Sequence, residues 1–197
     1  MTLPLSLKAF IQAPGCFHSR CVRIHLKFLK EGSGLNDSLR KMRLVFKTAD
    51  IGVTVASREY LSGPAFDSLL DLDVANGVTI TAEMEQLFSN RNFVVGNDVV
   101  LYFVRTLSLG AAGLATRSRG VAMLEFWTSG WTLAHELGHV LGPDHPTGEQ
   151  CSSPPCAAPI SRLMTGCGTA CIEGMATLTP DEIAMMRSSP FTSPCGQ

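Results

Sequence analysis

The amino-acid sequence predicts an α+β (mixed α/β) fold in which most strands are parallel. Two observations predict it: a strand, a helix and a strand follow one another over residues 22–56, and two further strands precede a helix in the second half of the chain. A strand–helix–strand succession implies a right-handed crossover between parallel strands. A hydrophobic content of 45% is sufficient for a packed core of this kind.

The strand–helix–strand unit is predicted by a change in the period of the apolar residues. The first strand is apolar at every second position, at Val22, Ile24, Leu26 and Phe28. We expect His25 to be a surface residue on the other side of this strand. The helix that follows has Asn36 or Asp37 as its N-cap. Its apolar face consists of Leu39, Met42, Val45 and Phe46. Residues 52–56 form the second strand.

Shorter elements complete the prediction. Thr81 caps a short helix, and small residues form a bend at 110–113. Thr179 caps a last helix that has Pro180 at its first position. Further strands are expected at residues 99–104 and 120–126, with an edge strand at 5–11. A helix that begins at Thr128 or Ser129 follows the 120–126 strand.

That helix carries the most informative motif of the chain. Residues 135–145 read His-Glu-Leu-Gly-His-Val-Leu-Gly-Pro-Asp-His, which is the pattern H-E-x-x-H-x-x-G-x-x-H. Four residues turn an α-helix by about 400° and advance it by about 6 Å, so His135 and His139 project from one face. Both can reach one Zn²⁺ ion, whereas Glu136 points about 100° away, where it can act on water beside the metal.

The residues after His139 provide a third ligand. Gly142 tolerates a positive φ and Pro143 cannot continue a helix, so the chain turns back and brings His145 to the metal. Three histidines leave a fourth coordination position open, which is typical of catalytic zinc. In a rival layout the third ligand is a later glutamate, Glu149 or Glu173, and Asp144 is an alternative to His145.

With these residues the sequence resembles the metzincin clan of zinc endopeptidases, although no subfamily is assigned. That clan has a methionine-containing turn beneath the metal, and residues 161–166 resemble this Met-turn, with Met164 as its methionine. The resemblance implies one catalytic domain over residues 1–197. An upper lobe, about 1–145, would hold a twisted, mostly parallel sheet with two long helices. A small irregular lower lobe, about 146–197, would end in a C-terminal helix.

The resemblance also implies a reaction. Zn²⁺ is the one catalytic cofactor, held by His135, His139 and His145, and Glu136 is the general base for a zinc-bound water. A protein or peptide substrate would lie extended along the strand before the zinc helix. The candidate substrate-binding residues on that strand are Gly120, Val121, Ala122 and Met123. The loop from 150 to 162 would form the lower wall of the cleft. Gly166 occupies the position where some members have an oxyanion-binding tyrosine.

Two other functions are compatible with the same residues. A metal-dependent amidase acting on a non-protein or cell-wall peptide would use identical chemistry. A metzincin-like module could instead bind a protein partner without cleaving it, although the presence of Glu136 counts against this.

Composition restricts partners and location. The chain has seven cysteines, four of them in a Pro- and Gly-rich stretch at 151–171, which favours disulfides and a secreted or periplasmic location over a second zinc site. One thiol is left unpaired. The net charge of −1 does not indicate nucleic acid binding, no apolar run could span a membrane, and we expect a monomer. Residues 1–50 nevertheless hold nine Lys and Arg against three acidic residues. This is read as a solvated basic face, with a patch for anionic surfaces or acidic substrates as the alternative.

The N-terminus and the loop at residues 71–77 give two further expectations. The N-terminus lacks the pattern of a signal peptide, so a signal or propeptide is expected to have been removed. Residues 71–77 weakly resemble a calcium loop, but they lack the closing glutamate, and calcium is unsupported.

Overall fold

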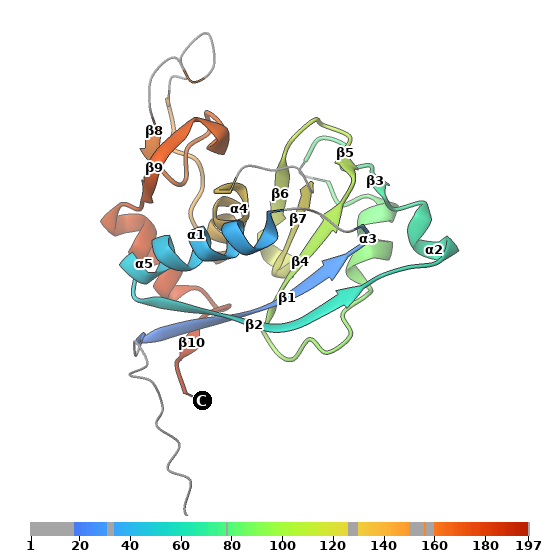
Figure 1. The fold of residues 1–197 in the computed structure, drawn as a ribbon, viewed down its shortest axis with the longest axis horizontal. Helices are drawn as coiled ribbons and strands as arrows, with labels where there is room; N and C mark the ends of the chain where they lie inside the picture. Colours follow the sequence, from blue (N-terminus) through green and yellow to red (C-terminus); the bar gives the residue numbers. More distant parts are fainter. Residues whose placement is uncertain are drawn as a thin grey trace, which may run out of the picture.

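The computed structural model describes residues 18–30, 34–77, 79–125, 130–149, 156 and 160–196. Its centre is a twisted sheet with the order β2-β1-β4-β7-β6, shown in Figure 1. The strands are β1 (Arg20–Phe28), β2 (Ile51–Tyr60), β4 (Val99–Val104), β6 (Gly113–Thr116) and β7 (Val121–Glu125). β1, β2, β4 and β7 are mutually parallel and β6 is antiparallel to β7. The predicted fold class, mixed α/β with a mostly parallel sheet, is confirmed.

Helices cover both faces of this sheet. α1 (Leu35–Thr48) and α4 (Thr132–Leu141) pack on one face, against the alternate apolar positions of β1 that begin at Val22. The short helix α3 (Ala82–Phe88) packs on the other face, against Val100 and Tyr102 of β4. Because β4 is covered on both faces, all six of its residues are buried, as expected for a central parallel strand.

Smaller elements lie around this core. They are α2 (Pro64–Asp67), β3 (Asp71–Leu72), β5 (Thr106–Leu107), β8 (Ile160–Arg162), β9 (Ile172–Thr177), α5 (Pro180–Ser188) and β10 (Ser193–Pro194). β8 and β9 pair with each other beside α5. β10 returns to pair with the start of β1, where a disulfide joins Cys21 to Cys195. Residues 193–195 are therefore tied to the central sheet.

Most predicted helices and strands are present, with differences at their ends. α5 begins as expected, since Thr179 accepts a hydrogen bond from the backbone N–H of Glu182 and Glu182 accepts one from that of Thr179, a capping box. The predicted N-cap of α1 is wrong. Gly34 precedes the helix and no side chain caps it, so Asn36 and Asp37 lie within the first turn. The expected edge strand at 5–11 lies outside the described residues. The predicted helix start at Thr128 or Ser129 is wrong, because residues 130 and 131 form a turn and α4 begins only at Thr132.

His25 is not a surface residue, contrary to the sequence-based expectation. Its side chain is 1% exposed. The ring bonds to Ser57 Oγ at 2.7 Å and to Asp98 Oδ2 at 2.9 Å. The face of β1 that carries His25 is covered by the segment that leads to Asp98, and period-two alternation cannot reveal such a cover.

Two further expectations concern membrane-spanning helices and the calcium-like loop at residues 71–77. Among the described helices, none is both long enough and apolar enough to cross a membrane. In the calcium-like loop, Asp71 is bound to Arg105, and Asp73 accepts hydrogen bonds from Ala75 N–H and the Ser108 hydroxyl. These acidic groups are not among the described clusters that could hold a metal.

Candidate metal centre

The three histidines of the motif converge at one point. α4 places His135 and His139 one turn apart, and the helix ends at Leu141 because Gly142 adopts a φ of 140°. The chain then turns back to His145. His139 Nε2 lies 3.0 Å from His135 Nε2 and 3.0 Å from His145 Nε2, and the third pair is 3.1 Å apart. The Nε2 atoms thus form a nearly equilateral triangle.

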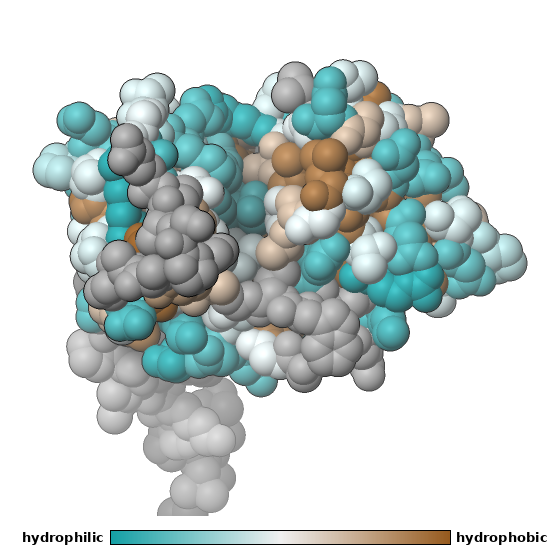
Figure 2. Space-filling view, turned by 90° about the horizontal axis from the view of Figure 1, so that it is seen from above, coloured by the Kyte–Doolittle hydropathy of each residue, from teal (hydrophilic) through white to brown (hydrophobic). Residues whose placement is uncertain are grey.

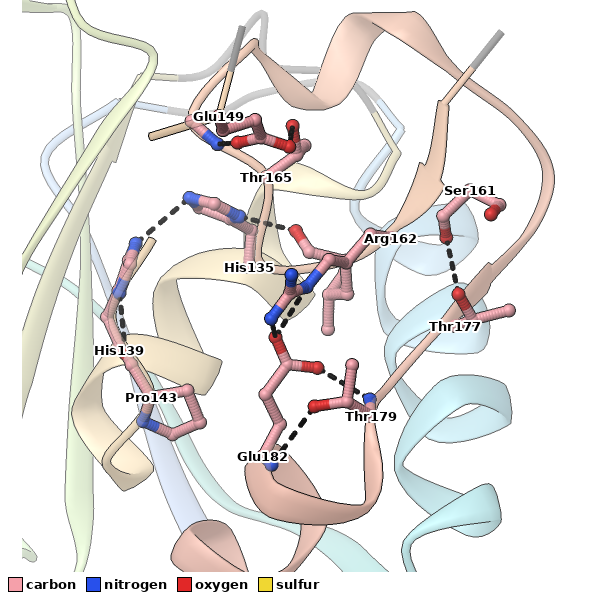
Figure 3. A network of polar contacts seen from close by, with 12 residues as sticks. His135, His139, Pro143, Glu149, Ser161, Arg162, Thr165, Thr177, Thr179 and Glu182 are labelled. Carbon is pink, nitrogen blue, oxygen red and sulfur yellow. Dashed lines mark hydrogen bonds and ion pairs between the residues drawn. The ribbon is translucent and has the colours of Figure 1, made fainter. Parts of the chain in front are cut away.

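Backbone carbonyls orient two of these rings. His135 Nδ1 donates to the carbonyl of Leu163 at 2.7 Å, and His139 Nδ1 donates to that of Pro143 at 2.9 Å (Figure 3). Because the carbonyls can only accept, the proton of each neutral ring sits on Nδ1 and the Nε2 lone pair faces the triangle. Burial lowers the pKa of His135 to about 4 and also lowers that of His139, which keeps both rings neutral.

This arrangement fits a zinc ion. Two nitrogen ligands at 2.0–2.1 Å from one tetrahedral ion are separated by about 3.3 Å, close to the spacing of the Nε2 atoms. Lone pairs that face each other this closely repel unless a cation lies between them. His135, His139 and His145 are the described group whose ligand atoms could hold a metal. A histidine triad consistent with zinc is therefore present.

Glu136 lies beside the triad and lines the same cavity. This cavity has a volume of about 510 Å³ and is bordered by residues of β6, α4 and the segment around Thr165. The Glu136 side chain is buried, and burial raises its pKa to about 8. Figure 2 shows the same face of the molecule hollowed in its middle, with apolar surface on the side that carries β3 and β5.

Gly113 determines how closely β6 approaches Glu136. A Cβ atom placed on Gly113 would lie 2.5 Å from Glu136 Cγ and 2.6 Å from Glu136 Oε1. No side chain fits at this position without displacing the carboxylate. The sequence had suggested only a bend of small residues here, whereas Gly113 begins a strand.

Arg117 is a second residue that sequence reasoning missed. Its guanidinium donates to the carbonyl of His139 at 3.1 Å, to that of Pro143 at 3.4 Å and to Asp144 Oδ1 at 2.8 Å. Arg117 thus holds the turn between the second and third histidines. Asp144 is directed to this ion pair, and its side chain is 82% exposed, so it does not replace His145.

Met164 lies beneath α4. It is fully buried, and a Cβ on Gly138 would lie 2.5 Å from Met164 Sδ, so Gly138 permits this close packing. The neighbouring turn is held by Glu149, which accepts hydrogen bonds from the Thr165 hydroxyl at 2.9 Å and from Gly166 N–H at 2.5 Å. Neither Glu149 nor Glu173 is part of the described histidine cluster, so the rival layout receives no support.

Glu182 anchors this turn to the last helix (Figure 3). Its side chain accepts from Arg162 Nε at 2.9 Å and from Thr179 N–H at 2.6 Å. The strand that leads into Met164 is thereby fixed to the N-terminus of α5. From the sequence Thr179 is predicted as the cap, but Glu182 and its partner Arg162 are not identified. The Thr-x-x-Glu spacing of residues 179–182, typical of a capping box, is the signal that points to Glu182.

The expected location of the substrate strand is wrong. Val121, Ala122 and Met123 belong to β7, which pairs with β4 on one side and β6 on the other, and Gly120 directly precedes it. No edge of β7 is available to a peptide. β6 pairs only with β7 in the described sheet, and Gly113, Leu114 and Ala115 line the cavity. Most of the loop from 150 to 162, the expected lower wall, lies outside the described residues.

Disulfides are present among the described cysteines. In addition to the bond between Cys21 and Cys195, Cys156 is joined to Cys171, and Cys167 is disulfide-bonded as well. The expectation that the cysteine-rich stretch forms disulfides is confirmed for these residues.

Comparison with known proteins supports the fold. No protein-family model and no curated protein matches the sequence. Among solved structures, metalloproteinase-II from Bacteroides fragilis matches with a TM-score of 0.58 and 17% identity over 88% of this chain. The chain spans 54% of that protein's length, about half. An archaemetzincin from Methanopyrus kandleri matches with a TM-score of 0.46 and 14% identity, covering 93% of this chain and 92% of its own. The chain therefore has a metzincin-like fold with a three-histidine cluster, in which His135 is buried, His139 is partly buried and His145 is exposed.

Proposed function

We propose that this protein is a zinc-dependent endopeptidase that hydrolyses peptide bonds of proteins or peptides. One observation carries the proposal: three histidine Nε2 atoms within 3.1 Å of one another and the Glu136 carboxyl line the same cavity of about 510 Å³. A histidine triad without a neighbouring carboxyl group could bind a metal but would lack a group to transfer protons. The combination provides both a metal site with an open side and a group that moves protons.

The positions of the three histidines and of Glu136 in the cavity suggest their roles. His135, His139 and His145 would hold Zn²⁺. When bound, the ion supplies Lewis acidity and lowers the pKa of water near it. Glu136 takes a proton from the attacking water and returns it to the nitrogen of the leaving amine. Burial raises the pKa of this carboxyl to about 8 in the metal-free protein, and a neighbouring divalent cation favours its charged form. Gly166 offers no side chain to the oxyanion.

The proposed substrate position is the edge of β6. An extended peptide that adds to this edge hydrogen-bonds through its backbone, which tolerates many sequences. The edge borders the cavity at Gly113, Leu114 and Ala115, so a peptide bound there passes the histidines. This replaces the location on β7 that was expected from the sequence.

The setting of the protein is part of the proposal. The disulfides indicate an oxidising environment. We place the enzyme outside the cell or in a periplasm, as one catalytic domain that acts as a monomer.

A cleavage assay with matched variants tests the function. Purified protein is loaded with one equivalent of Zn²⁺ and incubated with casein and with a peptide library, with and without a chelator. We expect cleavage that the chelator stops and Zn²⁺ restores. Glu136→Gln should lose at least 100-fold in kcat/KM while keeping its zinc, because general acid–base catalysis typically contributes about 10²–10⁴-fold. His139→Ala should lose the zinc itself.

The same assay separates the rival functions. Cleavage of amides in cell-wall peptides but not of library peptides would favour the amidase. Zinc binding without turnover on any substrate would favour the binding module. Full turnover in Glu136→Gln would refute the proposed mechanism.

A further inference from the structure

A second cavity lies away from the metal centre, between α1 and β2. Its volume is about 680 Å³. α1 and β2 lie on the same side of the molecule in Figure 1, and neither contributes to the lining of the metal cavity. None of the residues that line this groove is acidic. Its basic residues are His18, Arg40, Arg43, Lys47 and Arg58.

The positive charges of the groove are mostly unneutralised. The i, i+3 and i+4 spacing of α1 directs Arg40, Arg43 and Lys47 to the same side. Arg40 is paired with Asp37. Arg43 donates to the backbone carbonyl of Val53 at 3.3 Å, which brings its guanidinium over β2 without cancelling its charge. Among the described residues, Lys47 of α1 and Arg58 of β2 make no ion pair.

The groove also offers apolar surface and a strand edge. Leu44 lines it and is 36% exposed, so its side chain is available for apolar contact. In the described sheet β2 is an edge strand that pairs only with β1 over its 10 residues. An exposed strand edge is a template for an added extended chain. Charge alone would suit any polyanion, whereas a strand edge beside an exposed leucine suits a polypeptide.

We propose that this groove docks an extended, acidic polypeptide segment of another protein. The added segment would lie along β2, with carboxylates toward Lys47 and Arg58 and an apolar side chain against Leu44. Alternation of acidic and apolar residues matches the period of two of an extended chain. The chain's own residues 1–17 do not have this chemistry, since they contain Lys8 and no acidic residue. The site is independent of the proposed peptidase reaction.

Fluorescence anisotropy tests the docking. A labelled peptide of alternating Glu and Val is titrated with Glu136→Gln protein, which prevents cleavage of the probe. A matched peptide of alternating Gln and Val is the control ligand. We expect saturable binding of the acidic peptide and at least tenfold weaker binding of the neutral one. Equal affinity for the two peptides would overturn the proposal, as would no binding of either.

Variants locate the site and define its chemistry. Lys47→Glu/Arg58→Glu should weaken binding at least tenfold, since like charges then face the peptide. Lys30→Glu reverses an exposed charge outside the groove and should leave the affinity unchanged. Leu44→Ser should weaken binding severalfold at constant charge. An affinity that Leu44→Ser does not alter, together with equally tight binding of a labelled single-stranded DNA of the same charge, would identify a general polyanion surface and overturn the peptide site.

Discussion

His135 Nδ1 donates a hydrogen bond of 2.7 Å to the main-chain carbonyl of Leu163, across 28 residues of sequence. The bond joins the helix that carries two histidines to the residue before Met164. It fixes the tautomer of His135 and places the methionine beneath α4, where Gly138 leaves room for the sulfur. The methionine-containing turn thus acts on the site through a backbone carbonyl and through packing.

Gly113 is expected to control the position of the general base. In Gly113→Ala the new Cβ would lie 2.5–2.7 Å from atoms of the Glu136 side chain, which must move to make room for it. We predict that kcat falls at least tenfold while zinc content stays near one per chain. Displacement of a catalytic group by about 1 Å can cost up to about 100-fold. Normal kcat with bound zinc would show that the carboxylate position is not set by β6.

Arg117 is expected to position the third ligand. Arg117→Ala removes three hydrogen bonds to the turn that carries His139, Pro143 and Asp144. We predict about 10–100-fold weaker zinc binding, the usual cost of losing an outer-shell partner, measured by competition with a chromogenic chelator. Arg119→Ala is the matched control, because Arg119 belongs to the same short 3-10 helix as Arg117 (Arg117–Arg119) but pairs with Glu85 away from the site. Equal zinc affinity in the two variants would contradict this role.

The buried carboxyl of Glu136 predicts a pH-dependent stability of the metal-free protein. Burial raises its pKa from 4.5 to about 8 in the folded state. Below about pH 4.5 the group is protonated in both states and carries no penalty. Between pH 4.5 and pH 8 this carboxyl ionises in the unfolded state but stays protonated in the folded state. A rising pH therefore favours unfolding and lowers the free energy of unfolding. Urea unfolding should therefore show Glu136→Gln gaining stability over the wild type between pH 5 and pH 8.

Both proteins contain the same histidines, whose titration cancels in this comparison. A difference in the free energy of unfolding that is the same at pH 5 and pH 8 would contradict the raised pKa.

The bond between Cys21 and Cys195 is expected to stabilise the central sheet. It links β1 to the chain beyond β10 with a sequence separation of 174 residues. Cys21→Ser/Cys195→Ser should lower the free energy of unfolding by about 2–4 kcal/mol, measured with guanidinium chloride. Zinc affinity should be retained, because neither cysteine contacts the histidines. An unchanged unfolding midpoint would show that β10 pairing is sufficient without the bond.

Local patterns were enough to predict much of the molecule. The spacing of His135, Glu136 and His139 places them on one helix whatever surrounds it, since four residues make slightly more than one turn. Gly142 and Pro143 end that helix for reasons of backbone sterics, which brings His145 back. Thr179 caps the last helix by a bond within its own first turn. Alternation identified the first strand, and the strand–helix–strand order predicted the fold class.

The tertiary structure decided which backbone faces the cavity and which side chains support the site. Pairing order is a long-range property, so the sequence could not show that β7 is enclosed between β4 and β6 and that β6 is the edge. Three other features depend on residues that are distant in sequence. They are the burial of His25, the close approach of Gly113 to Glu136, and the hydrogen bonds of Arg117 to the turn after His139. Spacing along one helix determined two of the ligands, His135 and His139, and the helix-ending Gly142 and Pro143 determined the third, His145, because these are local properties of the backbone. The surroundings of the ligands depend on contacts that form only when the chain has folded.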